Sequence, residues 1–481
     1  MSLRPESPRR ARSAVPIAGE AAFADGVERL LASYRAIPET ASVRLAKKTS
    51  NLFRARAVTT APGLDVSGLG IVVSIDPQAR TADVAGMCTY EDLVAATLPF
   101  GLAPTVVPQL KTITLGGAVT GLGIESTSFR GGLPHEAVRS MDILTGAGEI
   151  VTAAPGGPNE DLFFGFPNSY GTLGYSVRLT IELEPVKRFV ELRHVRFHAL
   201  AELQDAMDRI IGAGEFDGEE VHYLDGVVFS ADEAYLCLGR QTDEDGPVSD
   251  YTGGDIFYRS IQHPDGVTRD RLTTHDYLWR WDTDWFWCSR AFGAQNPTIR
   301  RLWPKSMLRS SFYWKLVALD RRFDIGDRLA ARRGDPPGER VVQDVEVPIE
   351  NTTAFLEWFL TEIPIEPIWL CPLRLREPAP VGADPVRPWP LYPLEPKRTY
   401  VNIGFWSAVP MQPGQIEGRA NRLIETRVSE LDGHKSLYSD AFYTPEQFDE
   451  LYGGARFREL KAAYDPQGRL LDMYAKAVRR Q

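Results

Sequence analysis

The sequence predicts an α+β protein with more than one domain. Its 481 residues exceed the roughly 250–300 residues at which a single hydrophobic core usually stops growing. Short apolar segments bounded by glycine and proline alternate with segments of helical spacing, a pattern typical of mixed strands and helices. Near residue 186 glycine becomes rarer, and eight of the ten tryptophans follow between Trp279 and Trp369. This change of composition indicates a domain boundary.

The first 185 residues contain clear local signals. Residues 20–36 carry apolar side chains at helical spacing, and Thr89 is a suitable N-cap for a second helix. Gly146 to Gly148 separates two apolar runs, as in a β-hairpin. The expected elements are helices at 20–36, 90–98 and 159–164, and strands at 70–75, 81–86, 141–145, 149–152 and 174–183.

Charge and cysteine content argue against several functions. The net charge of −10 is opposite to that of most nucleic-acid-binding proteins. The four cysteines are far apart and form no CxxC pair, which argues against a zinc site and a disulfide framework. Residues 1–18 are basic and lack the apolar centre of a signal peptide. Arg, Pro and Ser dominate these residues, so we expect a disordered tail. No run reaches the ~18 apolar residues that span a bilayer, so we expect a cytoplasmic protein.

A glycine-rich segment at 107–126 is the most informative part of the chain. Its glycines let backbone N–H groups approach an anion closely, and its threonines add hydroxyl donors. A pyrophosphate suits such a site, while a turn-rich stretch of β-structure is the alternative interpretation. The segment lacks a Walker motif and the third glycine of the dinucleotide fingerprint.

Three motifs occur in the order found in one class of flavoproteins. Thr114 to Gly117, Asp161 to Phe163 and Gly171 to Gly174 resemble elements of the vanillyl-alcohol-oxidase class, which has a PCMH-type FAD-binding domain. Four further runs are similar to the delta-24 sterol reductase family and its actinobacterial relatives, which reduce 10-methylene fatty acyl chains; these runs are 121–126, 341–344, 367–372 and 437–440.

The resemblance implies a two-part FAD-binding domain with an α+β cap that covers the substrate. Its parts would be a tail at 1–18, an FAD-binding domain at 19–185, a cap at 186–414, and C-terminal helices at 415–481 that complete the FAD-binding domain. Many members attach FAD covalently through a histidine in the first phosphate loop, here residues 44–53. No histidine occurs there, so non-covalent FAD is implied.

The resemblance also implies cofactor contacts. The first loop would contribute cationic and hydroxyl donors, the second loop would line the pyrophosphate and flavin, and later residues would complete the site. These residues are Lys48, Thr49, Ser50, Asn51, Gln109, Thr114, Leu115, Gly116, Gly117, Gly121, Leu122, Gly123, Ile124, Glu125, Ser126, Gly171, Gly174, Tyr175 and Tyr438.

The expected cap contains two unusual segments. Residues 275–287 hold many large aromatic side chains, which predict either the wall of an apolar tunnel or an ordinary aromatic core. Residues 300–323 mix Arg and Lys with Trp, Tyr and Phe. That mixture suits either contact with an anionic lipid surface, such as the inner membrane face, or a solvated basic face.

An isolated alkene has no carbonyl to take up charge, so its reduction needs a proton donor beside the hydride source. Candidates for that donor or its hydrogen-bonded network are Tyr277, Arg280, His222 and Asp344. Tyr277 and Arg280 occupy positions similar to a Tyr and an Arg of the sterol reductase family.

The resemblance implies several functions, which we give in order of preference. The first is reduction of a 10-methylene to a 10-methyl acyl chain, with NADPH as donor and a SAM-dependent methyltransferase as partner. The second is reduction of a delta-24 sterol or isoprenoid side chain. A sugar or polyol oxidase and a non-catalytic flavin-containing lipid-binding subunit are further alternatives.

Overall fold

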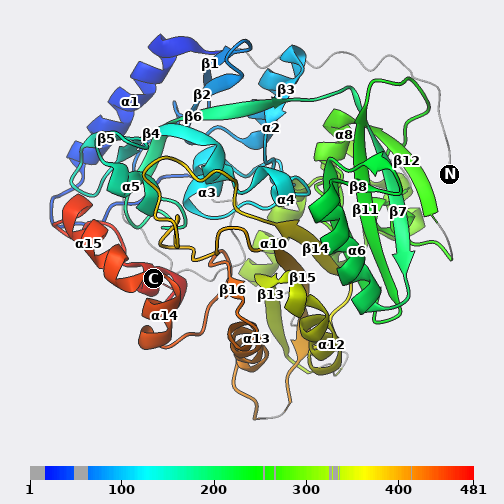
Figure 1. The fold of residues 1–481 in the computed structure, drawn as a ribbon. Coiled ribbons are helices and arrows are strands. Elements are labelled where there is room, and N and C mark those ends of the chain that lie inside the picture. The colour runs from blue at the N-terminus through cyan, green and yellow to red at the C-terminus, as the bar shows by residue number, and fades with distance from the viewer. Residues whose placement is uncertain are drawn as a thin grey trace.

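Two antiparallel β-sheets form the framework of the protein (Figure 1). The computed structural model describes residues 17–47, 63–252, 255–264, 267–323, 328, 334, 336–412 and 414–480. In the first sheet β6 is central, and β3 pairs with it beside the main path β1-β2-β6-β4-β5. The strands are β1 (Val72–Asp76), β2 (Thr81–Ala85), β3 (Leu102–Pro104), β4 (Val138–Leu144), β5 (Ile150–Ala153) and β6 (Tyr175–Pro185).

Short helices surround the first sheet. The Thr89 hydroxyl accepts a hydrogen bond from Asp92 N at 3.2 Å, so the expected N-cap of α2 is present. Gly101 adopts φ 67° directly after the helical turn that follows α2. These helices are α1 (Gly19–Ala36), α2 (Tyr90–Thr97), η1 (Leu98–Phe100), α3 (Leu115–Thr120), α4 (Ser128–Gly131), η2 (Pro134–Ala137) and α5 (Glu160–Gly165). The helices and strands expected in this part of the sequence are all present, with ends shifted by a few residues.

The second sheet has eight strands in the order β12-β7-β11-β10-β14-β15-β13-β16. Its neighbouring strands are antiparallel throughout, and β8 and β9 form a separate hairpin. The strands are β7 (Phe189–Phe197), β8 (Glu215–Phe216), β9 (Glu219–Glu220), β10 (Tyr223–Ser230), β11 (Glu233–Thr242), β12 (Val267–Thr273), β13 (Gly338–Pro348), β14 (Ile368–Leu373), β15 (Tyr400–Pro410) and β16 (His434–Lys435).

Both faces of the second sheet are buried. Side chains alternate along a strand, so Ile368 and Leu370 of β14 face one way while Trp369 and Cys371 face the other. The first pair joins an aliphatic core under the helices α6 (Leu200–Ala213), α12 (Thr352–Glu362) and α13 (Arg419–Glu430). The second pair joins an aromatic core shared with the first sheet. The outer face is thus covered by helices and the inner face by the rest of the protein (Figure 1).

The aromatic segment 275–287 lies in this shared core. Tyr277, Trp279, Trp281 and Trp287 are buried there, as the aromatic-core interpretation predicts. The other connecting helices are α7 (Phe257–Ile261), α8 (Thr274–Leu278), η3 (Cys288–Phe292), α9 (Pro297–Leu302), η4 (Lys305–Met307), α10 (Ser310–Phe323) and η5 (Ile349–Asn351).

The C-terminal part of the chain contacts both halves. Helix α13 and β16 pack on β13 of the second sheet, whereas α15 packs on α5 beside the first sheet (Figure 1). The last helices are α14 (Pro445–Leu451), α15 (Gly454–Tyr464) and α16 (Met473–Ala477). The protein is therefore an α+β protein of two joined parts, and the boundaries expected at 185 and 414 stay predictions.

Helix length and hydropathy bear on membrane insertion. Within the described ranges, none of the helices combines the length and the apolar character that crossing a bilayer requires. A cytoplasmic location stays a prediction.

Candidate active site

A cavity of about 710 Å³ lies between the first sheet, the inner face of the second sheet and the C-terminal segment. This volume is in the range of small-molecule sites, roughly 300–1,000 Å³. Its wall is polar and cationic where residues 42–47 and the glycine-rich segment meet, and aromatic at the second sheet. Lining residues from the sequence-based set are Gln109, Thr114, Gly116, Gly117, Gly121, Leu122, Gly123, Ile124, Gly171, Tyr175, Asp344 and Tyr438.

The polar part of the wall is built around the start of α3. The Thr114 hydroxyl accepts hydrogen bonds from Gly117 N and from Lys47 Nζ, each at 3.2 Å. Arg44 and Lys476 add two further cationic side chains to the lining. Lysine and arginine beside backbone amides and a hydroxyl are the groups that bind phosphate.

One tight turn brings the C-terminal segment to this wall. Tyr170 and Gly171 have φ values of 53° and 74°, and the second is favourable only for a residue without a Cβ. The Tyr170 hydroxyl accepts a hydrogen bond from Leu437 N at 2.8 Å. The backbone carbonyl oxygen of Tyr170 accepts another from Lys476 Nζ. The turn therefore fixes residues that follow it by more than 260 positions.

The aromatic part of the wall includes two strained residues. Trp285 and Phe286 have φ values of 48° and 57°, a region that bulky residues rarely adopt. Trp285 stacks on Trp314 at 5.5 Å between ring centroids, and Phe286 lies 4.9 Å from Trp281 and 4.4 Å from Trp406. Packing on both rings holds this turn in place. The tunnel-wall interpretation of segment 275–287 thus applies to these two residues.

A row of residues across three strands forms the floor beside the aromatic rings. Gly404 of β15 is paired with Asp344 of β13 on one side and with Trp369 of β14 on the other. A Cβ at Gly404 would lie 2.4 Å from Asp344 Oδ1 and 2.8 Å from the Trp406 ring. Glycine here leaves the space into which the Asp344 carboxyl projects.

Asp344 is the titratable group best placed for proton transfer. Its side chain lines the cavity, and burial raises its pKa to about 7, opposed in part by Tyr438 and Asn402. The Tyr438 hydroxyl also accepts a hydrogen bond from Trp406 Nε1 at 3.0 Å. A carboxyl group with this pKa can hold a proton near neutrality and release it.

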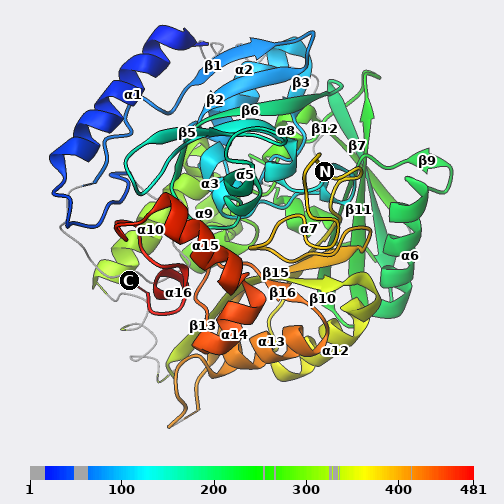
Figure 2. The same cartoon turned by 60° about the vertical axis from the view of Figure 1, so that its left-hand side comes forward.

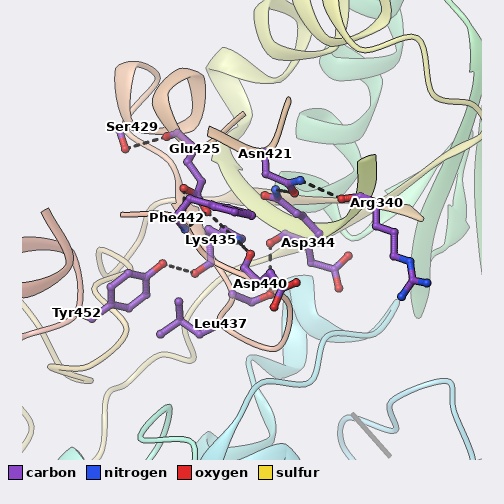
Figure 3. Close-up of polar contacts among 12 residues, drawn as sticks. Arg340, Asp344, Asn421, Glu425, Ser429, Lys435, Leu437, Asp440, Phe442 and Tyr452 are labelled. Carbon is purple, nitrogen blue, oxygen red and sulfur yellow. Dashed lines mark hydrogen bonds and ion pairs between the residues drawn. The ribbon is translucent and has the colours of Figure 1, made fainter. Parts of the chain in front are cut away.

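A buried ion pair fastens the segment that carries Tyr438 (Figure 3). Lys435 Nζ lies 2.9 Å from Glu425 Oε1 of α13 and also donates to the Asp440 carbonyl oxygen. The same Glu425 carboxylate accepts a hydrogen bond from Phe442 N at 3.1 Å. Both ends of the loop around Tyr438 are thus attached to one carboxylate.

Tyr277 and Arg280 lie in a buried network next to the cavity. Arg280 Nη2 is 2.8 Å from Asp225 Oδ2 of β10 and 3.2 Å from Glu125 Oε1 of the glycine-rich segment. The guanidinium also covers the Tyr277 ring at 4.0 Å. Burial raises the pKa of Glu125, and the Arg280 charge opposes that rise. The network joins the second sheet to the glycine-rich segment in the buried interior.

Ser126 extends this network, and Trp369 connects it to the cavity. The Ser126 hydroxyl lies 2.5 Å from Glu125 Oε1 and 2.9 Å from the Tyr277 hydroxyl. Trp369 Nε1 donates to Asp225 Oδ2 at 3.2 Å. Since Trp369 lines the cavity, the network orients part of the cavity wall.

The remaining residues expected at the site lie elsewhere or outside the described ranges. Leu115 and Gly174 are packed in the interior and are absent from the cavity lining, as are Glu125, Ser126, Tyr277 and Arg280. His222 is also outside the lining; its Nδ1 accepts from Gln241 N, and burial lowers its pKa. Lys48, Thr49, Ser50 and Asn51 lie outside the described residues.

Several lining residues were not expected from the sequence. Tyr170 and Lys476 come from an irregular turn and a short C-terminal helix, whose signals are local and carry no chemistry of their own. Trp369 is the cross-strand partner of Gly404, and Trp406 follows Gly404 by two positions on β15, so both lie on the face of the sheet that borders the cavity. Strand alternation around Gly404 is the one sequence signal that could have indicated them.

The wall fits FAD on two observations. The amide nitrogen Nε2 of Gln109 is buried at the cavity and has no hydrogen-bond partner among the described residues, so a donor is available to a ligand. Arg44, Lys47 and Lys476 would face the pyrophosphate, and the aromatic part of the cavity would accept a planar ring. Among the described side chains, no cluster of three His, Cys, Asp or Glu residues suits a metal ion.

Comparisons with known proteins agree with this geometry. Residues 24–154 match a family described as FAD binding domain. The chain is 27% identical to the human Delta(24)-sterol reductase over 417 residues, which is 84% of this chain and 75% of the relative. It is 24% identical to the Arabidopsis thaliana Delta(24)-sterol reductase over 443 residues, covering 86% and 76%. A shorter match, 33% identical over 161 residues and a third of each chain, is to the Decaprenylphosphoryl-beta-D-ribose oxidase of Mycolicibacterium smegmatis.

The fold, the cavity and these matches define the class of protein. The chain is an FAD-dependent oxidoreductase. It carries a PCMH-type FAD-binding domain and is homologous to the Delta(24)-sterol reductases over most of its length. The resemblance to PCMH-type FAD oxidoreductases and to the sterol reductases is therefore confirmed, whereas the resemblance to the relatives that reduce 10-methylene acyl chains stays a prediction.

The buried guanidinium of Arg280 makes a test of stability possible. Replacing Arg280 with Met leaves the carboxylates of Asp225 and Glu125 buried without their cation, so the free energy of unfolding should fall by about 3–5 kcal/mol. The loss should be smaller in acid, where the carboxylates can take up protons. Urea denaturation measures both effects.

Arg139→Met is the matched control for this measurement. Arg139 is half exposed and lies 3.4 Å from Glu182, so its loss should cost less than about 1 kcal/mol. Equal losses in the two variants would contradict the role given to Arg280.

Lys476 allows a test of cofactor binding. Lys476→Met should weaken FAD binding by about tenfold or more, because a charge-assisted hydrogen bond to phosphate would be lost. Flavin fluorescence during titration of the apoprotein gives the affinity. Lys187→Met removes an exposed lysine outside the cavity lining and should leave the affinity unchanged. Unchanged affinity in Lys476→Met would place the phosphates elsewhere.

Proposed function

We propose that this protein reduces an isolated C=C bond in a lipid, with FAD as its cofactor. The observation that carries the proposal is the cavity itself, in which a protonatable carboxyl, Asp344, faces a wall of Trp and Phe next to the glycine-rich segment. Similarity to the Delta(24)-sterol reductases over 84% of the chain supports it.

The aromatic wall suits an apolar substrate. Trp369 Nε1 donates to Asp225, and Trp406 Nε1 donates to Tyr438, so neither indole N–H is available to a ligand. These rings present carbon faces to the cavity, and Phe286 does the same. A polyol or sugar needs many hydrogen-bond partners, which this wall does not supply. The wall therefore favours an alkyl chain or a sterol over a sugar.

The protein's own residues would supply the proton and the geometry. When bound and reduced, FAD supplies a hydride for one alkene carbon. Asp344 donates a proton to the other carbon and becomes a carboxylate, so the net change is the addition of two hydrogens across the double bond. Tyr438 and Asn402 lower the pKa of Asp344, which stabilises the carboxylate that forms. Lys47, Arg44 and Lys476 would hold the cofactor phosphates at the other end.

For the substrate, we propose a 10-methylene acyl chain that is reduced to 10-methyl, with NADPH as the reductant. A SAM-dependent methyltransferase that makes the 10-methylene group would be its partner. This choice rests on the resemblance to the actinobacterial relatives and on the apolar wall. A sterol side chain is the second candidate, because the matches over most of the chain are sterol reductases.

The assay uses the reduced flavoprotein under anaerobic conditions. A phospholipid with a 10-methylene acyl chain is added, and flavin absorbance and product mass are followed. Rapid reoxidation with 10-methyl product supports the first substrate, and reoxidation by a Δ24 sterol alone supports the second. Reoxidation by oxygen alone, with neither alkene reduced, would contradict the proposed reductase.

Asp344 sets the expected pH dependence. Its acid form is the reactive one, so the rate of alkene-dependent reoxidation should be constant at low pH and fall as the pH rises through about 7. Asp344→Asn cannot donate a proton and should lower this rate by about 100-fold or more while FAD stays bound. Stopped-flow absorbance at a series of pH values measures both effects.

Glu136→Gln is the matched control. Burial also raises the pKa of Glu136 to about 7, but its side chain lies outside the cavity lining. This variant should keep the wild-type rate and pH profile. If the Asp344→Asn variant kept the wild-type dependence of the rate on pH, another group would be the proton donor.

A further inference from the structure

We propose that the surface formed by η3, α9, η4 and the outer side of α10 docks on an anionic lipid bilayer. We call this surface, which spans residues 288–323, the helical patch. Its contact with a bilayer would not depend on which substrate the cavity accepts.

The helical patch has a charge opposite to that of the whole protein. Residues 288–323 contain eight Arg or Lys and one acidic residue, Asp320, although the chain carries a net charge of −10. Arg300 is buried against Asp284 at 2.7 Å, and Arg309 pairs with Glu91 at 2.6 Å. Four further cationic side chains are exposed; they are Arg290, Arg301, Lys305 and Lys315.

Large apolar side chains are exposed among these cations. Leu302 is 80% exposed at the end of α9. Five of the twelve exposed large hydrophobic residues in the described part of the chain lie in 25 positions of this patch; they are Ile299, Leu302, Met307, Leu319 and Phe323. Such clustering on a protein surface marks a binding site rather than a solvated face.

The short helices form one continuous surface. Phe292 stacks on Tyr313 at 5.8 Å, and Trp303 lies 5.9 Å from Phe312, so η3 and α9 are both joined to α10. Helix α10 lies at the edge of the molecule (Figure 2). Its exposed positions Lys315, Leu319 and Phe323 are four residues apart and lie on one side of the helix, while Tyr313 and Trp314 are buried on the other.

The combination fits a membrane interface better than a soluble acidic partner. Exposed Leu, Ile, Met and Phe can enter the boundary between headgroups and acyl chains, while Arg and Lys beside them meet anionic headgroups. An acidic protein surface would complement the charges but would gain little from aliphatic tips spread over three helices.

The helical patch is connected to the cavity. Trp314, on the inner side of α10, stacks on Trp285 at 5.5 Å, and Trp285 lines the cavity. The helix that would contact the bilayer therefore also supports the cavity wall. If the proposed function holds, this arrangement brings a lipid substrate from the membrane to the cavity over a short path.

Binding of the FAD-loaded full chain to vesicles tests the proposal. Vesicles of phosphatidylcholine alone and of phosphatidylcholine with phosphatidylglycerol are sedimented with wild type and two variants, L302S/L319S and R301Q/K305Q/K315Q. Wild type should bind the anionic vesicles, and each variant should bind about tenfold more weakly. The control V381S/V386S changes side chains that are 81% and 75% exposed outside the patch and should bind as wild type.

Each other outcome overturns the proposal. Absence of wild-type binding to anionic vesicles would do so, as would wild-type binding by L302S/L319S. A loss confined to R301Q/K305Q/K315Q would indicate a site for a soluble polyanion instead. Equal binding of the wild type to neutral and to anionic vesicles would show that the cationic side chains do not direct binding. The flavin absorbance spectrum of each variant shows whether it is folded.

Discussion

The contact of one buried guanidinium with two carboxylates is the interaction on which the arrangement of the two sheets depends. Arg280 bonds Asp225 of the second sheet and Glu125 of the glycine-rich segment in the buried interior. Charges in such a place are costly unless they are paired, so neither half can move away without exposing or isolating a charge. Because Trp281 and Trp369 donate to the same Asp225 oxygen, this contact also sets the orientation of two aromatic rings.

The cavity separates two kinds of chemistry along its length. At one end, cations and backbone amides suit a permanently charged phosphate group; at the other, aromatic rings exclude water around one carboxyl. The same exclusion that admits an apolar molecule keeps the Asp344 carboxyl protonated near neutral pH. Apolar recognition and acid strength are therefore coupled, and a polar substitution in the aromatic wall would be expected to alter both.

The sequence predicts local structure and cofactor class better than it predicts the cavity. The helix capped by Thr89 and the hairpin around Gly148 depend on nearby residues, so their positions agree with expectation. The resemblance indicated Asp344, but not its neighbours: Gly404 and Trp369 face it only because three strands align in register. Lys476 and Tyr170 meet across 306 positions of sequence, a contact that no local pattern encodes. Whether the residues expected to contact FAD do so stays a prediction.

The cavity wall also constrains how the protein acquires its cofactor site. Segments near residues 44, 116, 171, 285, 404 and 438 all contribute, so the wall cannot close until distant parts of the chain have met. Contacts of such long sequence separation form slowly and late in folding. During synthesis the glycine-rich segment would therefore leave the ribosome long before the loop around Tyr438, with its binding surface still open. FAD is then expected to bind late, after the two sheets have folded, and to stabilise them. It is not expected to serve as a template on which the first sheet forms.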